Sequence, residues 1–248
     1  MKRNKISIAI ITKNAEKHLN KVLDAAKLLS DDIIVLDSYS TDKTQEIAQS
    51  YELKFLAATF KSYGNQKNLA NSMAKYDWIL SIDADEVLSQ ALIQEILELE
   101  LKTSKVYSIP FQNMYCGKLI RFGRWKNEKH VRLFEKDKVK WNESEVHESL
   151  DYDKRNILFL KSPILHYSMD SKAIHLDKAK KYSKIGAEVL KSKKKKSSII
   201  KLYLNPVFRF VKDYFFSLGF LDGKLGFQIA WIIAKETYWK YKRLKEIS

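Results

Sequence analysis

Three carboxylates follow directly after one apolar run of the chain. Residues 78–82 have the pattern of a buried strand, and Asp83, Asp85 and Glu86 come at its carboxyl end. Open α/β folds bind their ligands at that edge of the sheet. Hard oxygen ligands there suit Mg2+ or Mn2+, with a phosphorylated substrate completing the shell. The segment therefore predicts a nucleotide-phosphate site, and the alternative is a pair of solvated acids at a turn.

Three further strand patterns end in polar turns within the first hundred residues. The apolar runs are residues 6–11, 33–36 and 55–58, and a helical pattern follows each of them. Strand, polar turn and helix repeated in this way predict a parallel sheet with helices on both faces. The polar residues then gather along one edge of that sheet.

The polar turns form an ordered series of motifs. In chain order they are Thr12-Lys13-Asn14, Asp37-Ser38-Tyr39-Ser40-Thr41-Asp42, Gln66-Lys67-Asn68, Ser81-Ile82-Asp83-Ala84-Asp85-Glu86, Arg132-Leu133-Phe134, Val146-His147-Glu148 and Leu165-His166-Tyr167-Ser168. Together they resemble family 2 glycosyltransferases, and the last three are similar to the branch that adds β-1,4-linked glucose to the inner core of bacterial lipopolysaccharide. The resemblance covers nearly the whole chain. It departs at Tyr39, where that branch usually has Gly.

The resemblance implies the GT-A fold, a Rossmann-like α/β architecture with a mixed, mainly parallel sheet and helices on both faces. Residues 1–169 would form the GT-A catalytic domain, and residues 170–248 a helical extension, basic and aromatic, that is a candidate for membrane association. A chain of 248 residues with 45% hydrophobic residues can bury one full core and an appended subdomain. The single cysteine, Cys116, excludes an internal disulfide and fits a reducing compartment.

The resemblance also implies roles in donor binding. Thr12 and Asn14 would line the nucleotide pocket, and Asp37 would hydrogen-bond the uracil or ribose of a UDP-sugar. Lys67 would lie near the base or the phosphates, and Asp83 would contact the ribose or the metal. Two alternatives stay open, since Asp37 is also a typical helix cap and Lys67 a typical solvated helix lysine.

The implied metal ligands and catalytic base come from three other motifs. Asp85 would bridge Mg2+ or Mn2+ to the diphosphate, and His166 would add a neutral imidazole nitrogen unless it is a core histidine. An inverting transferase needs a base for the acceptor hydroxyl, and Glu148 is the implied residue. Glu143 and Glu145 are rivals, although strand alternation would put Glu148 on the opposite face from both. A surface glutamate beside a structural histidine is the remaining alternative.

Residues 106–134 are rich in aromatic and basic side chains. Aromatic rings stack on sugars and guanidinium groups pair with phosphate or carboxylate, so this segment is a candidate acceptor site, with Trp125 and Arg132 as its strongest members. Equally, the segment could be a β-hairpin whose aromatic rings cover the sheet, with Gly117 and Gly123 as turn residues.

The formal net charge of +15 is concentrated at the carboxyl end. Residues 1–169 carry 26 Lys and Arg against 23 Asp and Glu, and residues 170–248 carry 19 against 7. Basic residues interleaved with aromatics could bind nucleic acid, but we predict an anionic membrane surface, because a lipid-linked acceptor accounts for both the tail and the nucleotide-sugar site. Asp222 and Lys224 interrupt the most apolar stretch, so attachment would be peripheral. Alternatively, the aromatics only pack helices together.

The motifs and the family resemblance together imply a metal-dependent inverting glycosyltransferase. It would move a hexose, with glucose expected, from a UDP-sugar to a lipid-linked saccharide such as the lipopolysaccharide inner core. No export signal precedes the first strand, so we expect a cytoplasmic protein on the inner face of the bacterial inner membrane. Polyprenyl phosphate or a capsular glycan is the alternative acceptor. The non-enzymatic alternatives are a nucleic-acid-binding protein and an inactive nucleotide-sugar-binding module.

Overall fold

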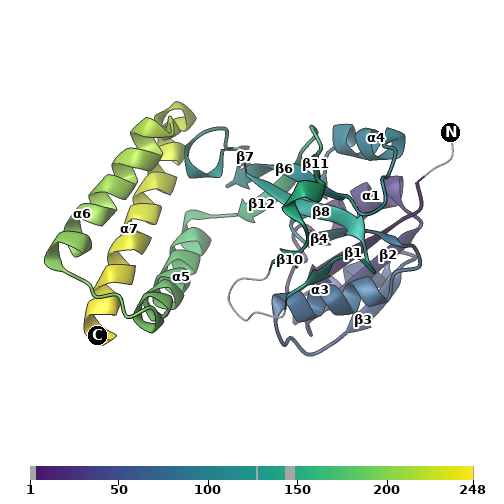
Figure 1. Cartoon of the computed structure of the whole chain (residues 1–248), viewed down its shortest axis with the longest axis horizontal. Helices are drawn as coiled ribbons and strands as arrows, with labels where there is room; N and C mark the ends of the chain where they lie inside the picture. The colour runs from purple at the N-terminus through teal and green to yellow at the C-terminus, as the bar shows by residue number, and fades with distance from the viewer. Residues whose placement is uncertain (1–3, 127, 143–148, 248) are drawn as a thin grey trace. The chain divides into compact units, whose positions relative to one another are not determined.

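A computed structural model describes residues 4–126, 128–142 and 149–247. Its contacts divide the chain into two compact units (Figure 1). Unit 1 comprises residues 1–111 and 128–166, and unit 2 comprises residues 112–127 and 167–248. The structure therefore groups residues 112–127 with the C-terminal helices. The predicted boundary after residue 169 assigns these residues to the catalytic domain.

Unit 1 is built on a mixed sheet. Its elements, in chain order, are β1 (Ile6–Thr12), α1 (Leu19–Leu29), β2 (Asp32–Asp37), α2 (Thr44–Gln49), β3 (Lys54–Ala57), α3 (Tyr63–Ser72), β4 (Trp78–Asp83), β5 (Glu86–Leu88), α4 (Gln90–Glu98), β6 (Val106–Tyr115), β8 (Lys129–Glu135), β9 (Lys140–Trp141), β10 (Leu150–Asp151), the 3-10 helix η2 (Lys154–Asn156), β11 (Ile157–Phe159) and β12 (Ile164–Met169), of which β6 and β12 run on into unit 2. The strand order is β3-β2-β1-β4-β8-β6-β12-β5. β3, β2, β1 and β4 are parallel, whereas β8 is antiparallel to both β4 and β6. The predicted α/β fold with a mixed sheet is confirmed.

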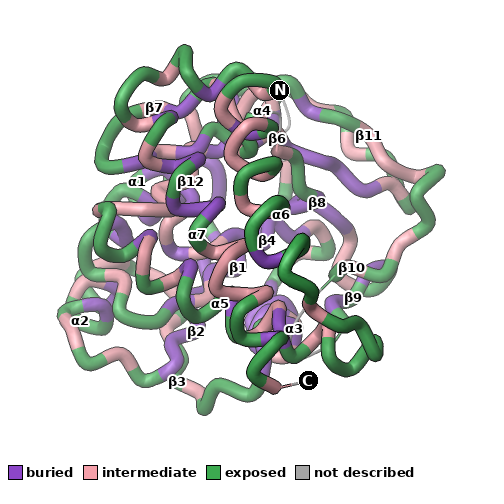
Figure 2. The backbone as a smooth tube through the Cα atoms, turned by 90° about the vertical axis from the view of Figure 1, so that its left-hand side faces the viewer, coloured by how far each residue is buried: buried purple, intermediate pink, exposed green. Residues whose placement is uncertain are grey.

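Successive side chains of β1 pack on opposite faces of the sheet. Ile8 and Ile10 belong to one apolar cluster with residues of α1 and α4, and Ala9 belongs to a second cluster with residues of α3. Ile8 and Ile10 are completely buried, which stabilises the fold by about 1.5–3 kcal/mol for each side chain. Helices therefore cover both faces, as predicted, and the central strands are buried (Figure 2).

The carboxyl ends of the parallel strands meet at one edge. In the register of the sheet, Thr12 pairs with Asp37 on β2, and Ile11 pairs with Asp83 on β4. Each strand ends at the point where the sequence changes from apolar to polar. The polar residues therefore gather at a single edge, where open α/β sheets bind ligands.

Unit 2 consists mainly of helices. Its elements are β7 (Lys118–Leu119), the 3-10 helix η1 (Gly123–Trp125), α5 (Lys172–Ser192), α6 (Ile199–Val211), the π-helix η3 (Lys212–Phe216), the 3-10 helix η4 (Gly219–Asp222) and α7 (Gly223–Ile247). Ser171 and Ser198 cap α5 and α6 by accepting hydrogen bonds from backbone N–H groups of the first turn. α7 packs against both α5 and α6, which confirms the predicted helical extension (Figure 1). Among the described helices, none combines the length and the hydropathy that crossing a bilayer requires.

Candidate active site

The acid motif lies on a tight connection between two strands. β4 ends at Asp83, residues 84 and 85 form the turn, and β5 begins at Glu86. The carboxylate of Glu86 accepts a hydrogen bond of 3.1 Å from the backbone N–H of Asp83, which closes the turn. β12 pairs antiparallel with β5, so that His166 lies opposite Glu86. The turn and this pairing bring the acids and the histidine together.

Glu86 and Arg132 form a buried ion pair. The guanidinium donates from Nε to Oε2 at 3.1 Å and from NH2 to Oε1 at 2.5 Å. Burial raises the pKa of Glu86, and the guanidinium opposes that rise. Arg132 is only 7% exposed, so its guanidinium contacts the acid cluster and the ring of Phe111, 5.3 Å from the ring centroid, rather than open solvent. Its predicted contact with an acceptor stays a prediction.

Asp83 is held between two cations. Its carboxylate lies 3.2 Å from Nζ of Lys67 and 3.5 Å from NH2 of Arg132. Burial raises the pKa of Asp83, but the charges of Lys67 and Arg132 outweigh it and lower the pKa to about 2. The Lys67 side chain is 3% exposed and its ammonium lies 4.4 Å from the ring centroid of Trp141, so the alternative of a solvated lysine is wrong. Asp83 is therefore ionised at neutral pH.

The two predicted metal ligands lie side by side. Nε2 of His166 is 3.6 Å from Oδ2 of Asp85. Burial lowers the pKa of His166, but hydrogen bonding and charge from Asp85, followed by Glu86 and Asp83, raise it above its ordinary value. Carboxylate oxygen beside imidazole nitrogen is a donor set that suits Mn2+, and Mg2+ through the oxygen. Within the described residues, no three His, Cys, Asp or Glu side chains are arranged to hold a metal ion.

The loops after β1 and β2 are tied to each other. Asn14 has a positive φ of 49°, and its side-chain oxygen accepts a hydrogen bond of 2.8 Å from the backbone N–H of Thr41. The carboxylate of Asp37 accepts hydrogen bonds from the backbone and hydroxyl of Ser40 at 2.7 and 2.5 Å. Asp37 thus fixes the turn after β2, but it does not cap a helix, because α2 begins only at Thr44. Its predicted contact with the nucleoside stays a prediction.

Two residues of this edge have features that ordinary folding does not require. Thr12 is 5% exposed, and its hydroxyl has no hydrogen-bond partner within the described residues. A buried hydroxyl without a partner is costly, so it is a natural contact for a ligand. Tyr39 has a φ of 57°, a conformation that costs a non-glycine residue about 1–2 kcal/mol. The backbone at residue 39 therefore favours Gly, the residue that the similar glycosyltransferase branch usually has there.

Glu148 and Trp125 are the remaining predicted residues. Glu148, with its rivals Glu143 and Glu145, falls within residues 143–148 and so outside the described residues. Trp125 belongs to unit 2, where its ring packs 5.6 Å from the ring of His175.

The sequence gives no sign of three contacts within the site. Trp141 lies over Lys67, Phe111 packs against both Arg132 and His166, and Glu86 is bound by Arg132. Glu86 is visible as part of the acid motif, but its partner lies 46 residues away. Trp141 and Phe111 have the pattern of ordinary strand residues. Only packing shows that they enclose the site.

Comparison with known proteins gives relatives over the whole chain. A glycosyltransferase of Rickettsia typhi is 32% identical over 98% of this chain and 88% of its own. The lipopolysaccharide core biosynthesis glycosyltransferase LpsC of Rhizobium meliloti is 25% identical over 95% of this chain and 93% of its own.

Solved structures give weaker likenesses. TarS 1-349 of S. aureus covers 95% of this chain and 80% of its own, at 16% identity and a TM-score of 0.42. Glucosyl-3-phosphoglycerate synthase of Mycobacterium tuberculosis, solved with Mn2+ and UDP, covers 46% of this chain and 44% of its own, at 22% identity and a TM-score of 0.35.

A family profile matches most of the chain. It is described as Glycosyl transferase family 2, and it matches residues 7–182. This span contains the carboxyl ends of β1, β2 and β4 and the whole of β12, the strand that carries His166. The chain belongs to glycosyl transferase family 2.

Proposed function

We propose that this glycosyltransferase is a metal-dependent inverting enzyme that transfers glucose from UDP-glucose to a lipid-linked saccharide of the lipopolysaccharide inner core. The observation that carries the proposal is the grouping of Asp83, Asp85 and His166 at the carboxyl edge of the sheet. Two acids and an imidazole at that edge can bind a cation and a nucleoside diphosphate together, because the diphosphate supplies the other oxygen ligands.

Each residue has a defined task in this mechanism. Asp85 and His166 would hold the divalent cation, which would supply positive charge to stabilise the departing UDP. Lys67 holds Asp83 ionised so that its carboxylate can accept hydrogen bonds from the ribose. Glu148 removes the proton from the acceptor hydroxyl, whose oxygen then attacks the anomeric carbon as UDP leaves from the opposite face.

The UDP moiety would bind in the loops after β1 and β2. The unpartnered hydroxyl of Thr12 and the side chain of Asn14 face a nucleotide in this proposal, and Asp37 accepts a hydrogen bond from the uracil or ribose. Asp37 already receives two hydrogen bonds from Ser40, which fix the orientation of its carboxylate. A preset carboxylate loses little rotational freedom when the nucleoside binds.

The acceptor and the location rest on similarity and charge. The relative LpsC has a name that assigns it to lipopolysaccharide core biosynthesis, and its match extends over 95% of this chain. Residues 170–248 carry 19 Lys and Arg against 7 Asp and Glu, which suits an anionic membrane surface. In this proposal the protein is peripheral on the cytoplasmic face of the inner membrane, and Trp125 contributes to the acceptor site.

Donor binding and turnover can be measured separately. Thermal unfolding is followed with a panel of nucleotide sugars and Mn2+, because a ligand that binds the native state raises its stability. UDP-glucose should protect most, and protection should fall when EDTA removes the metal. Transfer of labelled glucose to a core glycolipid extract then tests the acceptor.

Asp85→Asn is the decisive variant, with Asp137→Asn as its matched control. Asp85→Asn should lower metal-dependent turnover by about 100–1,000-fold, because it weakens the binding of the cation that stabilises the leaving group. Asp137 is an exposed acid in the turn after β8, so its substitution should leave turnover unchanged. Full activity of purified Asp85→Asn would rule out the metal assignment.

A further inference from the structure

A cationic pocket is lined entirely by residues of unit 2, and none of its lining residues belongs to the acid site. It has a volume of about 450 Å³. Its lining comes from the segment around η1, the end of α6, and η3 with the turn after it. The lining includes Arg124, Lys126, Arg209, Lys212, Asp213 and Phe216.

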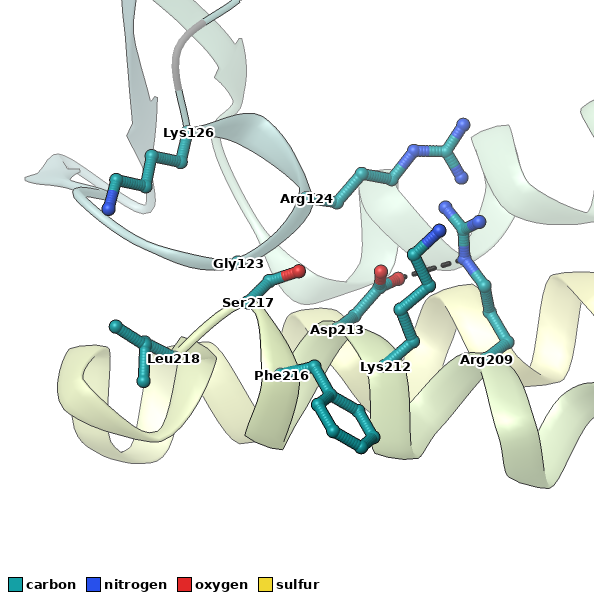
Figure 3. A pocket seen from close by; sticks show the side chains of 9 residues that line it. All are labelled: Gly123, Arg124, Lys126, Arg209, Lys212, Asp213, Phe216, Ser217 and Leu218. Atoms are coloured by element: carbon teal, nitrogen blue, oxygen red, sulfur yellow. Dashed lines mark hydrogen bonds and ion pairs between the residues drawn. The ribbon is translucent and has the colours of Figure 1, made fainter.

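Three cations of this pocket converge. Figure 3 shows the side chains of Arg124, Arg209 and Lys212 pointing toward one another near the Asp213 carboxylate, whereas Lys126 points the other way. Nε of Arg209 donates to Oδ2 of Asp213 at 2.9 Å, so this buried acid is already paired. An anion with more than one oxygen could contact the remaining cationic groups at once.

One further acid faces these cations. Glu236 on α7 is half-buried and interacts with the charges of Arg124 and Arg209. Burial raises the pKa of Glu236, which disfavours its negative form. With Asp213 and Glu236 both counted as charged, the three converging cations still leave a net charge of +1, to which Lys126 of the lining adds. The pocket therefore attracts anions.

An apolar stripe runs along α6 toward the pocket. Five of its side chains recur at the spacing of one face of α6 and belong to Ile200, Tyr203, Leu204, Val207 and Phe208, and Phe215 of η3 follows them; each of the six is more than half exposed. Only Leu202 of α6 is buried, and Figure 2 shows much of the helix in the exposed colour. The ring of Phe216, which lines the pocket, is 78% exposed. A contiguous exposed apolar surface of this kind marks a membrane or protein contact.

We propose that unit 2 is an interfacial lipid-binding module in which the α6 stripe enters the membrane surface and the Arg124–Lys212 pocket binds an exposed phosphate group of a membrane lipid. Complementarity indicates a phospholipid as the occupant. An apolar helix face can contact acyl chains, and the clustered cations beside it can bind the phosphate group. The inference deepens the proposed function by assigning its membrane contact to named residues. Lipid binding by unit 2 does not itself depend on a lipid-linked acceptor. Such an acceptor would explain why the enzyme binds a membrane.

The test is flotation of the full chain with defined vesicles. Phosphatidylcholine vesicles are compared with vesicles that also contain phosphatidic acid, and with vesicles brought to the same surface charge by cholesteryl hemisuccinate, which has no phosphate. We expect the strongest binding to phosphatidic acid. The double variant Arg124→Gln/Lys212→Gln should weaken that binding about 30-fold, since each cation near the surface contributes about 1 kcal/mol.

Matched variants separate the pocket from general charge. Lys195→Gln/Lys196→Gln removes two exposed cations of the lysine run outside the pocket and should change binding less than about threefold. Leu204→Ser/Phe208→Ser should weaken binding to all anionic vesicles. Equal losses of binding in Arg124→Gln/Lys212→Gln and Lys195→Gln/Lys196→Gln would overturn the phosphate site. Equal binding of the wild type to phosphatidic acid vesicles and to cholesteryl hemisuccinate vesicles would also overturn it.

Two other occupants are distinguished in the same series. If a second copy of the chain covers the stripe, light scattering should give a doubled mass, and Leu204→Ser/Phe208→Ser should reduce it to that of the monomer. Unchanged vesicle binding in that variant would refute the lipid contact. Isothermal titration with inorganic phosphate would reveal a soluble ligand. If Arg124→Gln/Lys212→Gln abolished that binding but left flotation unchanged, the lipid assignment would be wrong.

Donor protection by UDP-glucose is measured on every variant. It should survive in Arg124→Gln/Lys212→Gln, because neither residue belongs to the acid site. A wild-type chain that binds vesicles but gains no stability from UDP-glucose would refute the proposed function and leave the lipid site standing. Donor protection without selective flotation would refute the lipid site and leave the proposed function standing.

Discussion

The two units of this protein handle charge in opposite ways. In unit 1, Glu86 and Arg132 are buried, the side chain of Asp83 is 33% exposed, and each of the three has an oppositely charged partner within 3.5 Å. In unit 2, most cations lie at the surface, beside exposed apolar side chains. Buried and paired charges give fixed geometry, which chemistry needs, whereas exposed charges give attraction that tolerates many orientations.

Two histidines illustrate the same contrast. Burial alone would lower the pKa of His166, but three carboxylates raise it. His175 of unit 2 is 3% exposed, beside the rings of Tyr115 and Trp125, and burial followed by the charge of Lys178 lowers its pKa to about 4. The same side chain is therefore favoured as a cation in one unit and as a neutral group in the other.

Breaking the buried ion pair should have the largest effect. Arg132→Met leaves Glu86 buried without its cation, which should lower the free energy of unfolding by about 3–5 kcal/mol. Urea denaturation measures the loss. The double variant Glu86→Leu/Arg132→Met removes both charges and should recover most of the stability. If Arg132→Met were as stable as the wild type, the pair would not be the buried contact that distinguishes unit 1.

The neutral histidine gives a pH dependence of defined sign. Between its unfolded pKa of about 6.5 and its folded pKa of about 4, His175 binds protons mainly in the unfolded state. Stability is therefore fully present above about pH 6.5 and falls as pH decreases, by about 3 kcal/mol in total at pH 4. The variant His175→Phe should show a smaller fall over the same range. Identical pH profiles of unfolding in the two proteins would contradict the neutral assignment.

Substitution of the proposed base, Glu148, tests whether the residues of unit 1 carry the chemistry. Glu148→Gln should reduce turnover about 100-fold or more and leave protection by UDP-glucose nearly unchanged, because the base acts on the acceptor proton. Glu143→Gln and Glu145→Gln are the matched controls. Unchanged turnover in Glu148→Gln with a loss in either control would transfer the role to that residue.

Local patterns account for the parts of the fold that were correctly predicted. The alternation from an apolar run to a polar turn located the strands that end at Thr12, Asp37 and Asp83, since burial of a whole strand requires a continuous apolar sequence. Parallel pairing then forces those ends onto one edge. The grouping of residues 112–127 with the helices was not predictable in this way, because contacts between distant segments leave no periodic signal.

The sequence by itself determined the family, the acid edge and the basic character of the last 79 residues, because each depends on residue types in a fixed order along the chain. Only the tertiary structure decided which charges meet. Lys67, predicted either to lie near the base or the phosphates or to be a solvated lysine, is buried against Asp83 and Trp141, and Arg132 is paired with Glu86. The physical reason is that such pairings depend on the packing of helices and strands far apart in sequence, and in a buried environment they lower the pKa of Asp83 and raise that of Arg132.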